Sequence, residues 1–506
     1  MATTPIHLGL DLGTGTLKLG AFDARLEPVA VHQVGYALLD IPAHPDWAEV
    51  PARTWRGAIV QGLQELGAQV DLGAVVSVGL STVFPALLAF DPTGVPLYPA
   101  ILYLDQRSQA QVNWLDERGL RQEIEDRCGG IILPGSTSVT SILWMRDRAP
   151  DVFRQAAHFG HANTFVVRWL TGAWVIDTGS ASLTGLFNPA HADWDPLLLE
   201  ATGLSRQLFP DAKSGCDLGG RITAQAAQET GLPEGTPVAV GSGDSIAACL
   251  GTGVVEADDT LVVSGTTDSL CVCGDAPKPL SGVYLTCHAV PSRWLHIAAT
   301  SYTGGSLTWL AQIADKSHQD LLDVAGRANA GAGGLVFLPY LQGERSPILD
   351  AEARGAFAGL ADSTTLADLA RAVLEGAAMA LRHNIEALES RSGRHIGEIT
   401  LVGGPAASPL WNQVKADVCQ RPVRTVVLQD RSCLGAALTG AMAGGFVPEY
   451  RRWVRRRDYS GLKESLSAAC AAQRVYDPNP DRAAVYDDLF AKYVTLYPAL
   501  KGAGVF

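Results

Sequence analysis

Short apolar runs alternate with longer segments of helical period along the chain. The apolar runs have the length of β-strands and are bounded by Gly, Asp or Pro; they lie at residues 6–13, 75–81, 236–244, 260–268 and 398–405. Between them lie segments such as residues 366–388, where apolar residues recur at the spacing of one helix face. Because strands that alternate with such helices are typical of α/β proteins, the pattern predicts an α/β fold.

The C-terminal segment predicts a helix with an aromatic face. A helix bounded by prolines is expected after residue 476. Its apolar positions are Tyr486, Leu489, Phe490, Tyr493 and Tyr497. Large side chains at this spacing indicate a face that docks against the domain.

Two Gly-Thr turns hold corresponding places in the chain. The first is Gly13-Thr14-Gly15-Thr16 and the second is Gly265-Thr266-Thr267-Asp268. Each follows a strand-like run, and the turns begin at residues 13 and 265, which is 252 residues apart in a chain of 506. This offset predicts two halves of similar design, with domains at residues 1–255 and 256–506. A chance match between two short segments would also explain it.

Composition and charge narrow the class of protein. A chain of 506 residues is too long for one ordinary core, and 47% hydrophobic with 18% charged residues is a globular composition. The net charge of −13 works against binding to a phosphate backbone, so no nucleic-acid partner is expected. Nine scattered cysteines favour a reducing compartment, and no signal peptide or membrane span is readable. A soluble, cytoplasmic protein without a membrane partner is expected.

Several common catalytic signatures are missing from the sequence. It contains no P-loop and no G-x-G-x-x-G that opens a helix after a strand. It also contains no G-x-S-x-G elbow and no Cys/His cluster at metal-ligand spacing. Dinucleotide-binding, serine-hydrolase and zinc-dependent readings therefore lose most of their support.

The two Gly-Thr turns carry the groups that a phosphate site needs. Glycine lets backbone N–H groups approach phosphate oxygens, and Thr hydroxyls add donors. Asp11 stands just before the first turn, where a carboxylate can hold Mg²⁺, whereas the second turn has Val263 in that place. Either turn alone is also explained by an ordinary β-hairpin. Together they favour phosphate binding.

Asp244 is the strongest candidate for a catalytic residue. It follows an apolar strand and the small residues Gly241, Ser242 and Gly243, and it precedes an Ala-rich segment of helical pattern. Such a carboxylate can take the proton of a substrate hydroxyl during phosphoryl transfer. A helix N-cap is the simpler explanation of the same position.

A third Gly-rich element begins at Gly403-Gly404, after a strand-like run. Small residues there let a flat ring lie against the backbone, as adenine would. A tight connection between a strand and a helix explains the same residues.

These elements, in this order, resemble the FGGY family of carbohydrate kinases. DLGTGTLK resembles its first phosphate motif, SGTTDSL its second, GGPAASPLW its adenosine motif, and GSGDSIAACLGTG the segment with the catalytic Asp. The resemblance covers nearly the whole chain, and residues 340–360 look closest to xylulokinases. It implies two actin-like (ribonuclease H-like) ATPase domains that flank a nucleotide and sugar cleft.

The resemblance also implies ATP and Mg²⁺ as cofactors and a role for each motif residue. Asp244 would act as the catalytic base. Asp11 and Asp244 would help to hold the metal ion. Nucleotide contacts are implied for Gly13, Thr14, Gly15, Thr16, Lys18, Gly265, Thr266, Thr267, Gly305, Gly403, Gly404 and Asn412. Sugar contacts are implied for Thr82, Val83, Phe84, Asp105, Arg107 and Asp244. For Asp105, local pairing with Arg107 in a turn is the alternative.

One departure from the family pattern bears on the substrate. Xylulokinases typically show SGQMHG where this chain has STVFPA at residues 81–86. The polar Gln-Met-His group thereby becomes Val83-Phe84-Pro85, and substrate hydroxyls buried against apolar walls would be left unpaired. In the adenosine motif, Pro405 replaces a third Gly and removes one N–H.

The sequence therefore predicts an ATP-dependent carbohydrate kinase that phosphorylates a hydroxyl of a small sugar. The first candidate substrate is a ketopentose such as xylulose. A kinase for another ketose, a polyol or a sugar acid is the alternative within the family. An actin-like ATPase that switches a protein interface would share the phosphate turns, but it would not need Asp105 and Asp244. A third hypothesis is a family member that binds sugar and nucleotide without useful turnover. The carboxylates of Asp11, Asp105 and Asp244 argue against it. The sequence does not decide whether the protein forms a homodimer.

Overall fold

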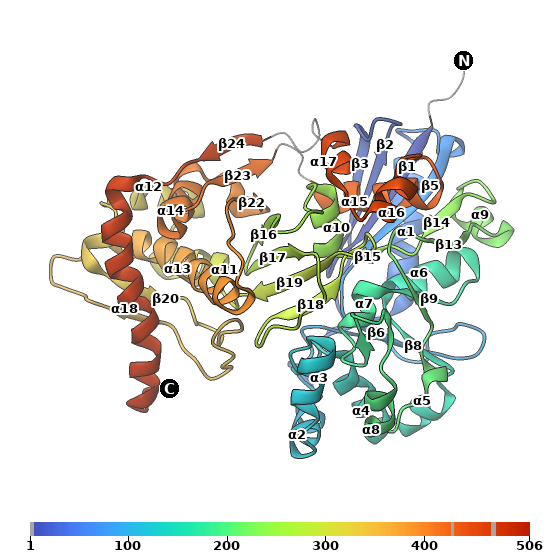
Figure 1. Ribbon diagram of the computed structural model, residues 1–506, viewed down its shortest axis with the longest axis horizontal. Coiled ribbons are helices and arrows are strands. Elements are labelled where there is room, and N and C mark those ends of the chain that lie inside the picture. The colour runs from blue at the N-terminus through green and yellow to red at the C-terminus, as the bar shows by residue number, and fades with distance from the viewer. Residues whose placement is uncertain (1–4, 427–429, 467–471) are drawn as a thin grey trace. The chain divides into compact units, whose positions relative to one another are not determined.

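The computed structural model describes residues 5–426, 430–466 and 472–506, with no account of the side chains at 472 and 473 (Figure 1). It divides into two compact units. Unit 1 takes in the described residues of Met1–Ala257, Cys273–Leu295 and Asp430–Cys470, and unit 2 those of Asp258–Val272, His296–Gln429 and Ala471–Phe506. The units are thus interleaved along the chain. The division into domains at residue 255 stays a prediction.

Unit 1 is built on a mixed sheet in the order β13-β14-β5-β1-β2-β3, with β15 also paired to β5. The strands are β1 (Ile6–Leu12), β2 (Thr16–Phe22), β3 (Pro28–Gly35), β5 (Val75–Thr82), β13 (Leu218–Arg221), β14 (Pro237–Ala239) and β15 (Ser242–Gly243). β1 runs antiparallel to β2 and parallel to β5. Leu8 and Leu10 of β1 are buried on one face of the sheet, and His7 and Gly9 are buried on the other, as expected for a central strand covered on both faces.

Helix α15 (Arg431–Ala443) lies directly on the central strands of unit 1, although it comes from the second half of the chain (Figure 1). Two glycines allow the approach. A Cβ at Gly9 of β1 would lie 2.0 Å from the carbonyl oxygen of Cys433, and one at Gly79 of β5 would lie 1.6 Å from that of Ala436. The helix and the strands therefore meet backbone to backbone.

Unit 1 contains further helices and short strands, some of which pack around a second hydrophobic core. Its remaining helices are α1 (Ala52–Leu66), α2 (Gln109–Glu117), α3 (Leu120–Cys128), α4 (Ser138–Arg148), α5 (Pro150–Gln155), α6 (Ala162–Thr171), α7 (Thr178–Ser182), α8 (Pro196–Thr202), α9 (Ala224–Thr230), α10 (Asp244–Gly251), α16 (Tyr450–Arg456) and α17 (Ser460–Ser465). Its short strands are β4 (Glu49–Val50), β6 (Ala86–Phe90), β7 (Ala100–Leu102), β8 (His158–Gly160), β9 (Val175–Asp177), β10 (Phe187–Asn188), β11 (Asp193–Trp194), β12 (Asp211–Lys213) and β18 (Tyr284–Cys287).

The sheet of unit 2 repeats the central arrangement of unit 1. Its strands follow the order β19-β17-β16-β22-β23-β24. They are β16 (Thr260–Ser264), β17 (Asp268–Gly274), β19 (Trp294–Ala299), β22 (Ile399–Val402), β23 (Val423–Val426) and β24 (Ala472–Tyr476). β16 runs antiparallel to β17 and parallel to β22, just as β1 pairs with β2 and β5. The strand, turn and strand design expected from the two Gly-Thr turns is therefore present in both units.

The described helices of unit 2 include the two that the sequence pattern predicted, at residues 366–388 and after residue 476. The helices of this unit are α11 (Thr303–Ala314), α12 (His318–Ala325), α13 (Leu366–Ser392), α14 (Pro409–Cys419) and α18 (Ala483–Gly502), with a short hairpin of β20 (Val336–Leu338) and β21 (Ala356–Ala358). The long helix α13 begins at a capping box of Thr365 and Asp368 and ends at Gly393, whose φ of 74° is left-handed. The predicted aromatic face of α18 is buried in the core of this unit, which confirms the docking prediction.

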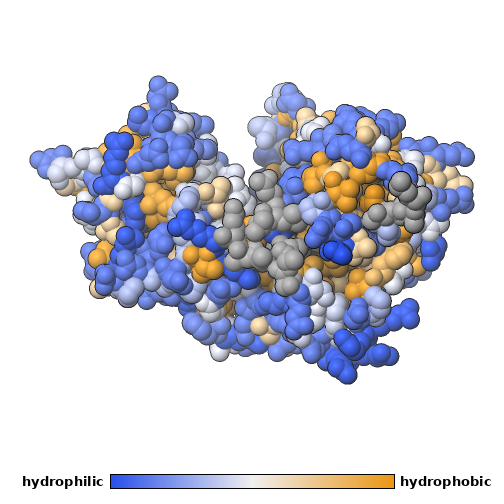
Figure 2. All heavy atoms as spheres, turned by 90° about the horizontal axis from the view of Figure 1, so that it is seen from above, coloured by the Kyte–Doolittle hydropathy of each residue, from blue (hydrophilic) through white to orange (hydrophobic). Residues whose placement is uncertain are grey.

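Polar side chains cover most of the face seen in Figure 2, and apolar patches lie between them. Among the residues that the structure describes, no helix is both long and apolar enough to cross a membrane.

Candidate active site

The first Gly-Thr turn closes the β1–β2 hairpin of unit 1. The Gly13 amide donates to the Thr16 carbonyl over 2.9 Å, and the Tyr36 amide donates to the Gly15 carbonyl over 2.9 Å. The Tyr36 hydroxyl also donates to the carbonyl of Gly13. The turn residues, Thr14 among them, are at least partly exposed to solvent. The turn is thus a braced hairpin whose tip is accessible.

Lys18, in β2, faces a carboxylate that the sequence analysis did not single out. Its Nζ lies 3.1 Å from Oδ1 of Asp430, the residue just before α15. The Lys18 side chain is 36% exposed and that of Asp430 is 23% exposed. Because both side chains are partly open to solvent, the pair adds little to stability.

Asp11 lies in a row of backbone pairs that crosses three strands. Asp11 of β1 pairs with Ser81 of β5, and Ser81 pairs with Ser242 of β15. The Ser81 hydroxyl donates to Oδ1 of Asp11 over 2.5 Å. Burial raises the pKa of the Asp11 carboxyl, while the Ser81 hydrogen bond and the charge of Lys18 oppose that rise.

Asp244 is the first residue of α10, immediately after β15. The N-cap position belongs to Gly243, so the capping explanation of Asp244 is wrong as the sequence analysis stated it. Its Oδ1 accepts the amide of Ser245 over 2.6 Å. The pKa of the Asp244 carboxyl is raised to about 7, first by burial and second by the negative charge of Asp11. The two carboxylates therefore belong to one electrostatic site.

This pair of carboxylates suits Mg²⁺ held together with phosphate. Mg²⁺ usually takes one or two carboxylates, several waters and substrate oxygens, rather than a cage of protein ligands. In the described part of the chain, no group of three or more His, Cys, Asp or Glu side chains could hold a metal ion. Asp11, with Asp244 beside it, is the arrangement that fits such a shared site.

The Thr82-Val83-Phe84 segment leaves β5 next to Asp244. Thr82 pairs with Gly243, and the absence of a side chain at Gly243 makes room for the Phe84 ring, because a Cβ there would lie 2.3 Å from Cδ1 of Phe84. The Phe84 ring is partly exposed, whereas Val83 lies in the core of unit 1. The buried hydroxyl oxygen of Thr82 has no hydrogen-bond partner within the described structure. Phe84 thus presents an apolar surface beside the candidate base.

Asp105 and Arg107 form a buried ion pair. Nε of Arg107 donates to Oδ1 of Asp105 over 2.8 Å and Nη2 to Oδ2 over 2.6 Å, and the Ala48 amide donates to Oδ2 over 2.7 Å. Arg107 also lies 2.7 Å from Oε1 of Glu49, with its guanidinium 3.7 Å from the Trp47 ring centre. Asp105 is fully buried. This geometry fits the local-pairing alternative, and direct sugar contact by either residue stays a prediction.

Three Gly-rich elements meet at the second turn, within unit 2. The turn itself, Gly265-Thr266-Thr267, closes the β16–β17 hairpin, and Gly265 and Thr266 are exposed. The Gly305 amide at the start of α11 donates to the Thr266 carbonyl over 3.0 Å. Gly403 has a φ of 101°, and a Cβ there would lie 1.9 Å from the carbonyl oxygen of Ser264. Backbone from three parts of the sequence therefore converges on one exposed turn, as a phosphate cradle requires.

Asn412 supports the adenosine-like motif through a side-chain hydrogen bond. Its Nδ2 donates to the Ala406 carbonyl over 2.8 Å, within the turn that follows Gly403 and Gly404. The Asn412 side chain is buried, and its Oδ1 lacks a hydrogen-bond partner among the described residues. Gly404 is exposed. The structure thus places Gly404 at the surface and Asn412 in a supporting position.

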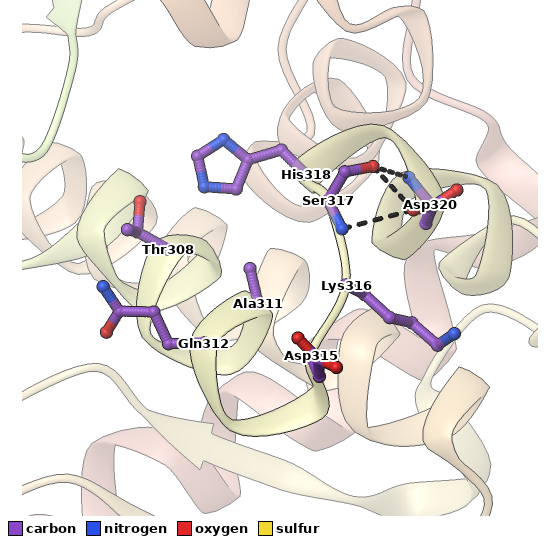
Figure 3. Close-up of a pocket in the computed structure, with 8 residues that line it drawn as sticks. All are labelled: Thr308, Ala311, Gln312, Asp315, Lys316, Ser317, His318 and Asp320. Atoms are coloured by element: carbon purple, nitrogen blue, oxygen red, sulfur yellow. Dashed lines mark hydrogen bonds between the residues drawn. The ribbon is translucent and has the colours of Figure 1, made fainter.

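A surface pocket of unit 2 involves none of the predicted site residues. It has a volume of about 540 Å³ and lies where α11 ends and α12 begins. Figure 3 shows its lining side chains, with Ser317 and Asp320 hydrogen-bonded to each other at the start of α12. The predicted residue Gly305 stands at the opposite end of α11.

Three residues that support the candidate site are not recognisable from the sequence alone. Tyr36, Ser81 and Asp430 in unit 1 each contact a predicted residue through a side chain. Ser81 adjoins the segment already singled out and stands in register with Asp11, but that register is not visible without strand pairing. Asp430 carries no local signal beyond its place before an Ala-rich helical segment.

Paired carboxylates and two accessible Gly-Thr turns in an α/β chain are features that a phosphotransferase requires. The family model for the FGGY family of carbohydrate kinases, N-terminal domain, matches residues 6–251, and that for the C-terminal domain matches residues 260–444. The chain therefore belongs to the FGGY family of carbohydrate kinases. It is a phosphotransferase that uses an alcohol group as acceptor.

Individual relatives cover most of the chain. The xylulose kinase of Escherichia coli (strain K12) is 30% identical over 82% of this chain and 84% of its own length. The autoinducer-2 kinase of Yersinia enterocolitica is 28% identical over 97% of this chain and 94% of its own length. The crystal structure of a xyloylose kinase from Brucella ovis matches with a TM-score of 0.89 at 29% identity, over 98% of this chain and 100% of that one. This likeness confirms the prediction of an α/β fold with two actin-like domains.

Proposed function

We propose that this protein transfers the γ-phosphoryl group of ATP to a hydroxyl of a small sugar, with Asp244 as the general base. The observation that carries the proposal is the Asp244 carboxyl at the start of α10, whose pKa is raised to about 7 beside Asp11. A base with a pKa near the working pH accepts a proton well, and about half of it is still ionised there.

The nucleotide is proposed to be ATP, because ATP use is implied by the kinase family. The exposed turns at Gly13–Thr16 and Gly265–Thr267 offer backbone N–H groups and Thr hydroxyls to phosphate oxygens. Bound Mg²⁺ would neutralise part of the negative charge of the phosphates. Asp11 would hold it, and Lys18, whose ion pair with Asp430 is partly exposed, would supply a further cation for phosphate.

The proposed acceptor is a ketopentose such as xylulose, and the support comes from relatives that are named xylulose kinases. A second candidate is another ketose, a polyol or a sugar acid, and one observation favours the less polar members of this group. Phe84 lies beside Gly243, so the wall next to Asp244 is aromatic. An aromatic wall favours a substrate with an apolar face over one with hydroxyls on every side.

The test is a coupled ADP-release assay over a panel of ketoses, polyols and sugar acids, with D-xylulose first. Asp244→Asn removes the proton acceptor and should lower sugar-dependent turnover by about 10²- to 10⁴-fold. Asp217→Asn is the control, because the pKa of that carboxyl is also raised, whereas among the described residues it accepts the Ser214 amide in a turn that contains none of the predicted site residues.

The outcomes separate the candidates. Sugar-dependent ADP release that Asp244→Asn abolishes and Asp217→Asn retains would support the kinase. ATP turnover that needs no sugar and survives Asp244→Asn would instead favour an ATPase that switches a protein interface. Higher kcat/KM on D-xylulose than on the rest of the panel would support the ketopentose, and a higher value on a less polar acceptor would support the second candidate.

A further inference from the structure

A lysine and an aspartate are buried together beneath the second Gly-Thr turn. Nζ of Lys415, in α14, lies 3.1 Å from Oδ2 of Asp268 and 2.9 Å from Oγ of Ser264. The Ser264 hydroxyl in turn donates to Oδ1 of Asp268 over 2.5 Å. Both charged side chains are 1% exposed. Burying two charges is expensive, and stability alone does not explain it, because apolar residues of similar volume often serve as well.

The place of the pair suggests what it does. Ser264 is the last residue of β16 and Asp268 the first of β17, and they pair across the hairpin, so they close the base of the turn Gly265–Thr267. The Asp268 amide also donates to Oγ1 of Thr300 over 2.9 Å, in the loop that leads to α11. The Lys415 ammonium therefore anchors the base of the exposed turn to helix α14.

Helix α14 also supports the adenosine-like turn. Asn412, one helical turn before Lys415, donates to the Ala406 carbonyl, while Gly403 lies against the Ser264 backbone. Two side chains three residues apart on one helix thus contact the two Gly-rich elements. Because α14 is regular between them, the helix fixes the spacing of those elements.

We propose that Lys415 is a positioning residue for the nucleotide, which sets the phosphate turn at Gly265–Thr267 at a fixed distance from the adenosine-like turn at Gly403–Gly404. It acts through Ser264 and Asp268 and does not touch the ligand. The inference rests on the proposed function, in which these turns bind ATP. Asp268 balances the charge of Lys415, so the effect on affinity is one of geometry.

The test replaces the pair as a whole. Lys415→Met combined with Asp268→Asn removes both charges at nearly constant volume, which avoids leaving one buried charge without a partner. ADP affinity by calorimetry and the KM values for ATP and for sugar are the readouts. We expect ADP affinity to fall and the KM for ATP to rise about tenfold, with the KM for sugar within twofold of wild type.

A second buried pair in unit 2 supplies the matched control. Nε of Arg371 lies 2.7 Å from Oε1 of Glu375, with side chains 5% and 1% exposed, and the pair joins α13 to α18 through Tyr486. Arg371→Met combined with Glu375→Gln should change the melting temperature and leave ADP affinity as it is. A purely structural role for Lys415 would make the two double variants behave alike.

Each outcome decides the inference. A folded Lys415 double variant with wild-type ADP affinity would overturn it. If that variant does not fold, Ser264→Ala removes one partner of the ammonium without stranding a charge, and an ADP affinity lowered about threefold supports the inference while an unchanged one overturns it. Wild-type protein that binds no adenine nucleotide also overturns it. Protein that binds ADP but phosphorylates no sugar refutes only the proposed function.

Discussion

The raised pKa of Asp244 predicts that the carboxyl group opposes folding at neutral pH. In the folded protein its pKa is about 7, against an ordinary value of 3.8. The difference corresponds to about 4 kcal/mol between the two protonation states. Removing the ionisable group should therefore stabilise the protein at pH 8 by up to about 4 kcal/mol. This figure is an upper value, because the side chain is only partly buried.

The sign follows from proton binding in the two states. Below pH 4 both states hold the proton, so the carboxyl group does not change stability. Between pH 4 and pH 7 the unfolded chain has lost the proton and the folded one keeps it, so stability falls by about 1.4 kcal/mol per pH unit. Above pH 7 the loss is complete. Asp244→Asn lacks this loss and keeps an oxygen for the Ser245 amide.

The assay is thermal unfolding of wild type and Asp244→Asn between pH 4 and pH 8 in the absence of nucleotide, sugar and metal. The variant should melt several degrees higher at pH 8, and the difference should shrink steadily toward pH 4. Asp217→Asn supplies a reference for a carboxyl group outside the site. A difference between wild type and Asp244→Asn that is constant with pH would refute the reasoning, because burial and the charge of Asp11 would then not act on this group.

Three further predictions concern the site. Gly243→Ala places a methyl group against the Phe84 ring and should raise the KM for sugar at least tenfold with the KM for ATP unchanged, which steady-state kinetics would check; equal changes in both values would contradict it. Gly403→Ala puts a side chain at a φ of 101°, 1.9 Å from a carbonyl oxygen, and should weaken ADP binding at least tenfold in calorimetry, whereas wild-type affinity would refute the close approach. Asp105→Asn breaks a buried ion pair with Arg107 and should cost about 3–5 kcal/mol, seen as a lower melting temperature; unchanged melting with a raised KM for sugar would favour direct sugar contact instead.

Local pattern predicted those parts of the fold that local forces determine. The strand runs at residues 6–13 and 260–268 contain β1 and β16, and the segment at 366–388 is the body of α13, because side-chain periodicity alone indicates such elements. The aromatic face of α18 was predicted for the same reason. Helix α15 is different, because the sequence does not show which sheet an Ala-rich helix will cover.

The candidate site also has residues that local sequence predicts and contacts that depend on packing. Asp11, Asp244 and the Gly-Thr turns stand in short motifs, so their chemistry could be proposed from neighbouring residues. Lys415 and Asp268 are 147 positions apart, and their contact depends on how α14 packs beneath the hairpin. The N-cap assignment of Asp244 failed for a smaller reason, since one residue decides which group caps a helix.

The glycine contacts of α15 bear on how this enzyme can change its substrate. Besides its contacts with β1 and β5, α15 meets α10 backbone to backbone, since a Cβ at Gly435 would lie 1.9 Å from the Ala247 carbonyl oxygen and one at Gly251 would lie 2.1 Å from that of Arg431. The frame that carries Asp11 and Asp244 thus has no side chain at these contacts that mutation could enlarge without a clash. Laboratory evolution toward a new sugar should therefore leave these glycines untouched and collect its substitutions at residues 82–86, the segment whose Phe84 ring lies beside Gly243, next to the candidate base.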